Sequence, residues 1–101
     1  MKVRITAEAE RDLEGIADCI AQDNPQRALS FIRELRDKCL SLAETPLAFS
    51  LVPRYERFGV RRRVHGSYLI FFRVEEKQVV VLHVLHGATD YAGILDNSPG
   101  E

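Results

Sequence analysis

The sequence has no long apolar run, and this absence excludes a membrane-spanning helix. No stretch approaches the ~20 apolar residues that a span needs, and the start, MKVRITAEAE, lacks the apolar segment of a secretory signal. The chain has 101 residues, of which 46% are apolar and 29% charged, values typical of one globular domain. We therefore expect a cytoplasmic protein without membrane contact, with a single domain over residues 1–96 and a frayed tail over 97–101.

Cysteine is scarce, and histidine is not arranged for metal binding. Cys19 and Cys39 stand 20 positions apart without a CxxC partner, which suits reduced, buried thiols better than a metal knuckle or a disulfide framework. A bridge between neighbouring helices is the alternative. His83 and His86 are three apart, so on a strand their side chains point to opposite faces. We expect no metal and no cofactor, and histidines satisfied within a sheet.

Several signatures of catalysis and nucleic-acid binding are missing as well. The chain has no glycine-rich phosphate loop, no nucleophile elbow and no Ser/His/Asp arrangement. Its net charge is −1 and its pI about 6.3, so nothing in the overall charge favours direct nucleic-acid binding. One segment differs, because residues 51–73 carry six arginines against the single carboxylate of Glu56. A short basic segment thus stands on an otherwise acidic molecule.

Hydrophobic periodicity predicts two amphipathic helices that pack as an antiparallel hairpin. Thr6 is a suitable N-cap for a first helix over residues 7–22. Asn24 before Pro25 caps a second helix, which we expect to continue until Thr45-Pro46 stops it. Cys39 falls in the middle of the apolar stripe of this second helix, which favours a buried thiol.

Strands are expected on both sides of the helices. Residues 2–5 alternate polar and apolar side chains, as a half-buried strand does, although their place in the sheet stays open. After the helices, turns at Gly66-Ser67 and at EEK separate three strands of a meander. A short helical turn within ATDYAGIL follows. The three strands are expected over residues 60–65, 68–75 and 78–86.

The segment between the helices and the meander, residues 47–60, has no clean period and many apolar side chains. Such residues either cover the sheet or await a partner, and covering is the ordinary role in a small domain. In the strand that follows, Arg61 and Arg63 share a face with His65, while Arg62 lies on the other. Fixed cations beside His65 and Tyr68 could grip a phosphate or activate a ribose hydroxyl. They could equally pair with the acids of the helices and stay solvated.

The order of elements, together with two stretches, resembles the RelE/ParE superfamily of toxin–antitoxin toxins, and its ParE branch fits best. The stretches are AERDLEGIADCIAQDNPQRALSFIRELRDKCLSLAETP and YLIFFRVEEKQVVVLHVLHGATD, and the resemblance spans about residues 2–91. It implies an α+β fold in which an N-terminal strand and an antiparallel two-helix hairpin pack on a mainly antiparallel sheet, completed by a three-stranded meander. One departure is Thr89, because ParE-like sequences commonly have Arg before the Asp of this closing motif.

The resemblance implies a type II toxin that is neutralised by a ParD-like antitoxin and that inhibits DNA gyrase by binding, without chemistry of its own. Leu47, Phe49, Tyr55 and Phe58 are the candidates for seating the antitoxin. The candidates for contact with the target are Arg61, Arg63, Arg73, His86 and Asp90.

Two alternatives stay open. The first is a ribosome-dependent endoribonuclease of the RelE kind, with His65 or His86 as acid or base, Arg61 or Arg73 on the phosphate, and Tyr91 near the scissile nucleotide. Against it, no lysine lies between residues 39 and 76, whereas the nuclease branch is expected to carry a lysine-rich strand set. The second alternative is a degenerate, non-toxic binding module, which Thr89 would suit.

Overall fold

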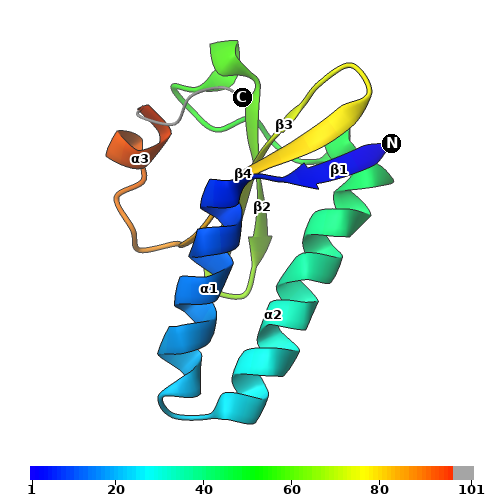
Figure 1. The fold of residues 1–101 in the computed structure, drawn as a ribbon. Coiled ribbons are helices and arrows are strands. Elements are labelled where there is room, and N and C mark those ends of the chain that lie inside the picture. Colours follow the sequence, from blue (N-terminus) through cyan, green and yellow to red (C-terminus); the bar gives the residue numbers. More distant parts are fainter. Residues whose placement is uncertain (97–101) are drawn as a thin grey trace.

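The computed structural model describes residues 1–96, so the tail expected over 97–101 lies outside the described residues. The elements follow the predicted order of one strand, a helix hairpin, a meander of strands and a short helix (Figure 1). The first half consists of β1 (Lys2–Ile5), α1 (Ala7–Ala21), α2 (Pro25–Leu40) and the 3₁₀ turns η1 (Ser41–Ala43) and η2 (Pro46–Ala48). The second half consists of η3 (Glu56–Phe58), β2 (Val60–His65), β3 (Tyr68–Val74), β4 (Gln78–His86) and α3 (Ala92–Asp96).

The four strands form one mixed sheet in the order β1-β4-β3-β2. The meander β2-β3-β4 is antiparallel, as predicted, and its first turn uses Gly66 at φ 60°, a left-handed conformation that glycine adopts readily. β1 pairs with β4 in parallel, which gives the N-terminal strand the edge position that the sequence left open. The predicted fold class, a helix hairpin on a mainly antiparallel sheet, is confirmed.

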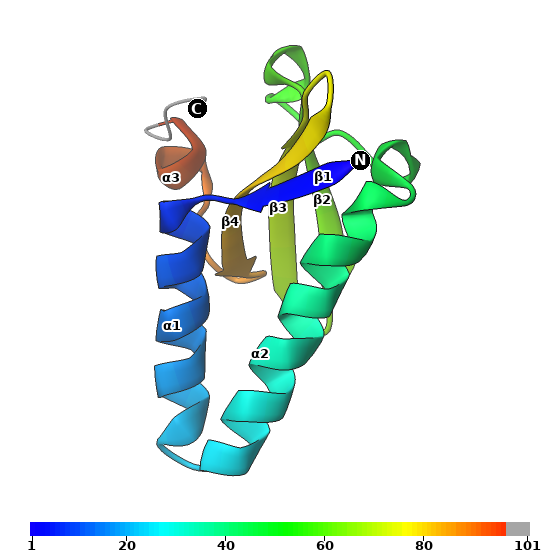
Figure 2. The same ribbon diagram turned by 45° about the vertical axis from the view of Figure 1, so that its right-hand side comes forward.

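Both long helices begin where the sequence predicts. The Thr6 hydroxyl accepts a hydrogen bond from the Ala9 amide at 3.2 Å, and the Asn24 side chain accepts one from the Arg27 amide at 3.0 Å, as N-caps do. The two helices run side by side as an antiparallel hairpin in both views (Figures 1 and 2). None of the helices among residues 1–96 is long and apolar enough to cross a membrane.

The second helix is shorter than predicted. It ends at Leu40, and the chain continues in the separate turns η1 and η2 instead of reaching Thr45. At the end of α2 the Ser41 hydroxyl donates to the Lys38 carbonyl oxygen at 3.0 Å. The Arg63 side chain of β2 also donates to the Lys38 carbonyl oxygen, a contact that the local sequence does not indicate.

The hydrophobic core lies on both faces of the sheet, and the segment of residues 47–60, called the irregular segment below, contributes to it. The helix hairpin covers one face, where Leu13, Leu35 and Phe72 are fully buried. The other face is covered by the irregular segment and by α3, with Val52 and Leu95 packed on Phe71 and its neighbours. Much of the apolar segment before the meander therefore covers the sheet, as the ordinary reading of the sequence predicted.

The two cysteines have different environments. Cys39 is fully buried on the core-facing side of α2, as predicted, and burial raises the pKa of its thiol to about 11. Cys19 is exposed on α1, so the expectation that both thiols are buried is wrong for this residue. Both are free thiols, and the interhelical bridge is not formed.

Candidate partner-binding surfaces

Arg61 and Arg63 project from β2 toward the helix side of the sheet and bind the protein's own backbone. Arg61 Nη1 donates to the Phe49 carbonyl oxygen at 2.7 Å. Arg63 Nη1 donates to the Lys38 carbonyl oxygen at 3.1 Å and to Ser41 Oγ at 2.8 Å. The Arg63 guanidinium also stacks on the Phe49 ring, 4.9 Å from its centroid. These two arginines tie β2 to the end of α2 and to the loop after it.

Arg73 lies on the opposite face of the sheet. Arg73 pairs with Val60, whose side chain belongs to the core on the face covered by α3. The Arg73 side chain is only 19% exposed. Its Nη2 donates to Glu75 Oε2 at 2.8 Å. Hydrogen bonds, first from Gln78 and then from Arg73, hold the pKa of the Glu75 carboxyl below its usual range. The structure therefore divides the three predicted arginines between two faces.

His65 and His86 come together on either side of Tyr68. The three residues are opposite one another across β2, β3 and β4. The Tyr68 and His86 rings meet edge to face at 5.3 Å, and Phe31 of α2 lies 5.4 Å from the Tyr68 ring. His65 Nε2 is 3.3 Å from Glu34 Oε1. The nuclease alternative names either His65 or His86 as acid or base, and the structure places both in this row on one face of the sheet.

Glu34 belongs to a small charged cluster beside this row. It forms an ion pair with Arg27 of the same helix. The hydrogen bond from Arg27, more than that from His65, holds the pKa of the Glu34 carboxyl below its usual range. Glu34 thus stays ionised beside His65. Tyr91, by contrast, packs on Phe71 at 5.0 Å, away from the row.

Asp90 lies in the turn that leads into α3. It is exposed, and its Oδ1 accepts a hydrogen bond from the Ala92 amide at 3.3 Å. A shallow hollow of about 280 Å³ lies beside it. The hollow is lined by residues 53–55 from one segment and 89–92 from the other. Thr89, which stands where ParE-like sequences commonly have Arg, faces this hollow.

Tyr55 fixes one wall of the hollow. Its hydroxyl donates to Asp96 Oδ1 at 2.9 Å and lies 3.1 Å from the Ala92 carbonyl oxygen. Burial, together with the Asp96 carboxylate, raises the pKa of Tyr55 above its usual value, so the hydroxyl remains a neutral donor. The Tyr55 side chain therefore links the segment of residues 47–60 to α3 by hydrogen bonds.

The four side chains predicted to seat an antitoxin differ in exposure. Leu47 and Phe58 are 67% and 52% exposed. Phe49 is half-buried and meets the Phe72 ring edge to face at 6.0 Å, and Tyr55 is only 8% exposed. Two of the four are therefore available to a partner without rearrangement, and they stand on separate turns, η2 and η3.

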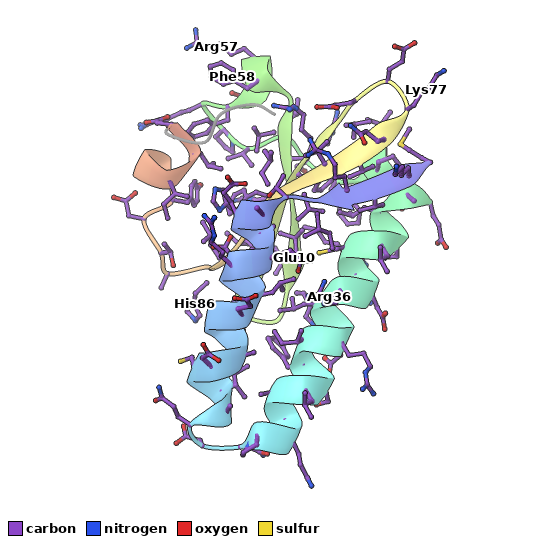
Figure 3. The ribbon with its side chains drawn as sticks, in the orientation of Figure 1. Glu10, Arg36, Arg57, Phe58, Lys77 and His86 are labelled. Atoms are coloured by element: carbon purple, nitrogen blue, oxygen red, sulfur yellow. The ribbon has the colours of Figure 1, made fainter. Side chains whose placement is uncertain are left out.

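Sequence reasoning missed several surface residues. Arg57 stacks on the neighbouring Phe58 ring at 4.7 Å, and Figure 3 shows the pair at the end of the molecule opposite the α1–α2 connection. Leu29 and Leu40 of α2 are 71% and 53% exposed. The consecutive residues Arg57, Phe58 and Gly59 could have indicated that an arginine stacks on a ring beside a turn, but nothing in them indicated that the ring is exposed.

The structure offers no metal centre in the part of the chain that it describes. Across residues 1–96, no three His, Cys, Asp or Glu side chains gather to hold a metal ion. His83 is buried and binds Asp12 of α1, with Nδ1 and Oδ2 2.9 Å apart. The expectation of a satisfied sheet histidine is confirmed for His83.

Known structures share this architecture. One, described as the chromosomal ParDE toxin–antitoxin system from P. aeruginosa, has a TM-score of 0.71 at 22% identity, covering 85% of this chain and 95% of the other. Another, the RelBE toxin–antitoxin complex from Mycobacterium tuberculosis, has a TM-score of 0.63 at 26% identity, covering 84% and 95%. No curated protein matches the chain. The fold is therefore that of the RelE/ParE superfamily.

The family follows from the sequence itself. The model of the ParE toxin of the type II toxin–antitoxin system parDE matches residues 3–91, which is most of the chain. The protein belongs to the ParE toxin family, and it is the toxin component of a type II toxin–antitoxin system.

Proposed function

We propose that this toxin acts by binding DNA gyrase, without cutting nucleic acid, and that a ParD-like antitoxin neutralises it in the cytoplasm. The observation that carries the proposal is the match to the ParE family over residues 3–91. ParE-like toxins are gyrase poisons, as the resemblance in sequence implied. The similar structure from P. aeruginosa is described as a ParDE toxin–antitoxin system, which supports an antitoxin of the ParD kind.

The use of the arginines favours binding over phosphate chemistry. A nuclease needs cations that can reach a phosphorane, but Arg61 and Arg63 already donate to backbone carbonyls. Arg73 donates to Glu75 on the other face. Among the predicted target contacts, His86 and Asp90 are the two exposed ones, and both stand at the C-terminal end of β4 or just beyond it. We place the target contact on this end of β4.

One observation favours a second candidate, a ribosome-dependent endoribonuclease. His65 and His86 flank Tyr68 on one face of the sheet, with Arg27 and Glu34 beside them. Two imidazoles near a fixed cation could serve as acid and base on a ribose phosphate. This arrangement would place the chemistry at the row and not at Arg73 or Tyr91.

Purified toxin in gyrase supercoiling and cleavage assays separates the two candidates. The proposal predicts inhibited supercoiling with trapped DNA breaks, reversed by the antitoxin encoded beside the toxin. The matched variant is His86→Gln, which keeps a polar side chain but cannot act as a base at neutral pH. Transcripts cut on translating ribosomes by the wild type, and left intact by His86→Gln, would establish the nuclease and refute the proposal.

A further inference from the structure

The turn η3 and its neighbours form a small protrusion that carries an exposed aromatic ring. We call residues 54–59 the tip. Phe58 is 52% exposed, and the Arg57 guanidinium stacks on its ring 4.7 Å from the centroid. Aromatic and arginine side chains are enriched among the residues that dominate binding energy at protein interfaces. A single exposed ring is ordinary on a protein surface, but the stacked guanidinium and the hydrogen-bonded backbone beneath it distinguish this one.

The tip is rigid, which lowers the cost of binding through it. The Phe58 amide donates to the Tyr55 carbonyl oxygen at 3.0 Å, and the Gly59 amide donates to that of Glu56 at 2.9 Å. Gly59 has φ 72°, a left-handed conformation that favours glycine. The Tyr55 side chain anchors the base of the tip to α3. An anchor side chain held in place loses less entropy on association than a mobile one.

Arg54 adds a second unusual feature. It has φ 77°, the only non-glycine residue with positive φ among residues 1–96. A bulky residue in this region is strained, and such strain gathers where function requires a particular backbone. Here the strained peptide places Arg54 at the side of the tip, where it also lines the hollow beside Asp90. Through Arg54 and Tyr55 the tip therefore adjoins residues 89–92 across this hollow.

Charge and shape together indicate the kind of partner. The tip carries Arg54 and Arg57 against one carboxylate, Glu56, so an acidic surface would be attracted to it. A convex protrusion fits a preformed concave pocket, which is a feature of folded proteins. An antitoxin segment that folds on binding would instead seek a groove or an apolar helix face. Such faces lie on α2, where Leu29 and Leu40 are exposed.

We propose that Phe58, stacked by Arg57, is the anchor with which the toxin enters an apolar pocket edged by carboxylates on its target protein. The inference rests on the proposed function, since it supplies the contact for a toxin that acts by binding. It also moves Phe58 from the predicted antitoxin set to the target set.

The test compares Phe58→Ala with the wild-type full chain in three measurements. These are gyrase supercoiling inhibition, growth arrest on expression without antitoxin, and affinity for the antitoxin. We expect Phe58→Ala to weaken inhibition at least tenfold and to relieve growth arrest, because truncating an interface anchor commonly has this effect. Antitoxin affinity should stay within twofold, which also shows that the variant is folded. Phe58→Tyr, which keeps the ring, should retain activity.

Leu29→Ala is the matched control, because Leu29 is a more exposed apolar residue on α2, away from the tip. It should leave inhibition and growth arrest unchanged. Full toxicity of Phe58→Ala, or a tenfold loss of its antitoxin affinity, would overturn the inference. A wild-type toxin that arrests growth without inhibiting gyrase would instead refute the proposed target, and the growth comparison would still decide the role of the tip.

Discussion

Arg62 and Arg63 are neighbours in the sequence but have different surroundings in the structure. The alternation of β2 sends their side chains to opposite faces of the sheet. Arg63 reaches the last turn of α2, where it donates to the Lys38 carbonyl oxygen and to Ser41 Oγ. A cation at this position is favoured by the negative end of the helix dipole, and it donates to a carbonyl that also accepts from the Ser41 hydroxyl. The role of Arg63 is therefore set by a segment more than twenty residues away in the sequence.

Arg63→Ala should consequently lower stability, although its place in a charged segment suggested a surface role. Loss of two hydrogen bonds from a charged donor should cost about 1.5–3 kcal/mol of the free energy of unfolding. Arg33→Ala, at an exposed position of α2, should change it by less than about 0.5 kcal/mol. Urea unfolding measures both. Equal stability of the two variants would show that the Arg63 contacts contribute nothing.

Cys39 predicts a pH dependence in the alkaline range. Burial raises the pKa of its thiol from 9.0 to about 11. The unfolded chain then loses this proton near pH 9 while the folded chain keeps it, so stability is present below pH 9 and falls as pH rises toward 11. The loss amounts to at most about 1.4 kcal/mol per pH unit. Unfolding of wild type and Cys39→Val between pH 8 and 10.5 isolates it, because valine has no ionisable thiol while the other titrating groups are the same in both proteins. Parallel curves would contradict the prediction.

At the scale of elements, the local sequence was enough to predict where the helices begin and where the meander turns. It was not enough to predict where α2 ends or which strand lies at the edge of the sheet. Thr6 and Asn24 predict the starts of their helices because an N-cap side chain accepts from an amide only three positions further along the chain. The end of α2 depends on Arg63, and the place of β1 depends on pairing with β4, both of which are contacts distant in sequence. Such contacts leave no periodic pattern, so the sequence alone could not indicate them.

The edge of β4 shows one such contact. β1 pairs with β4 only as far as Val81, and one extra residue in β4, Leu82, shifts the register against β3. Beyond the end of β1, side chains from α1 and from its N-cap form hydrogen bonds with the edge of β4. The Thr6 hydroxyl donates to the Leu82 carbonyl oxygen at 3.2 Å, and Asp12 Oδ2 accepts from the Val84 amide at 3.0 Å. Side chains thus close an edge that would otherwise have unpaired backbone groups.

Asp12 should therefore be important for the attachment of α1 to the sheet. Asp12→Ala leaves both the Val84 amide and His83 Nδ1 without their acceptor, which we expect to lower the free energy of unfolding by about 2–3 kcal/mol. Glu14→Ala, at an exposed position on the same helix, is the control and should have little effect. The measurement is chemical unfolding, with hydrogen exchange of the Val84 amide as a local readout. Unchanged exchange in Asp12→Ala would contradict this account.

At the scale of the whole molecule, one small sheet carries different surfaces on its different sides. The helix hairpin closes one face and leaves Leu29 and Leu40 exposed on α2, whereas Arg57 and Phe58 of the tip lie at the end of the molecule opposite the α1–α2 connection (Figure 3). The fold could be predicted almost completely because its periodic elements are encoded locally. The surfaces could not, because exposure of Leu47 and burial of Tyr55 depend on how the irregular segment packs.

An antitoxin that binds only the folded toxin should raise its melting temperature. At a free antitoxin concentration of 100 times Kd the stabilisation is about 2.7 kcal/mol, which corresponds to roughly 10–20 °C for a domain of this size. Leu47→Asp should melt like the wild type alone, because Leu47 is 67% exposed, but should lose much of the antitoxin-induced shift if this leucine seats the antitoxin. Phe58→Ala should keep the shift. Thermal unfolding of the three proteins, each with and without antitoxin, gives the comparison, and a full shift for Leu47→Asp would remove η2 from the antitoxin surface.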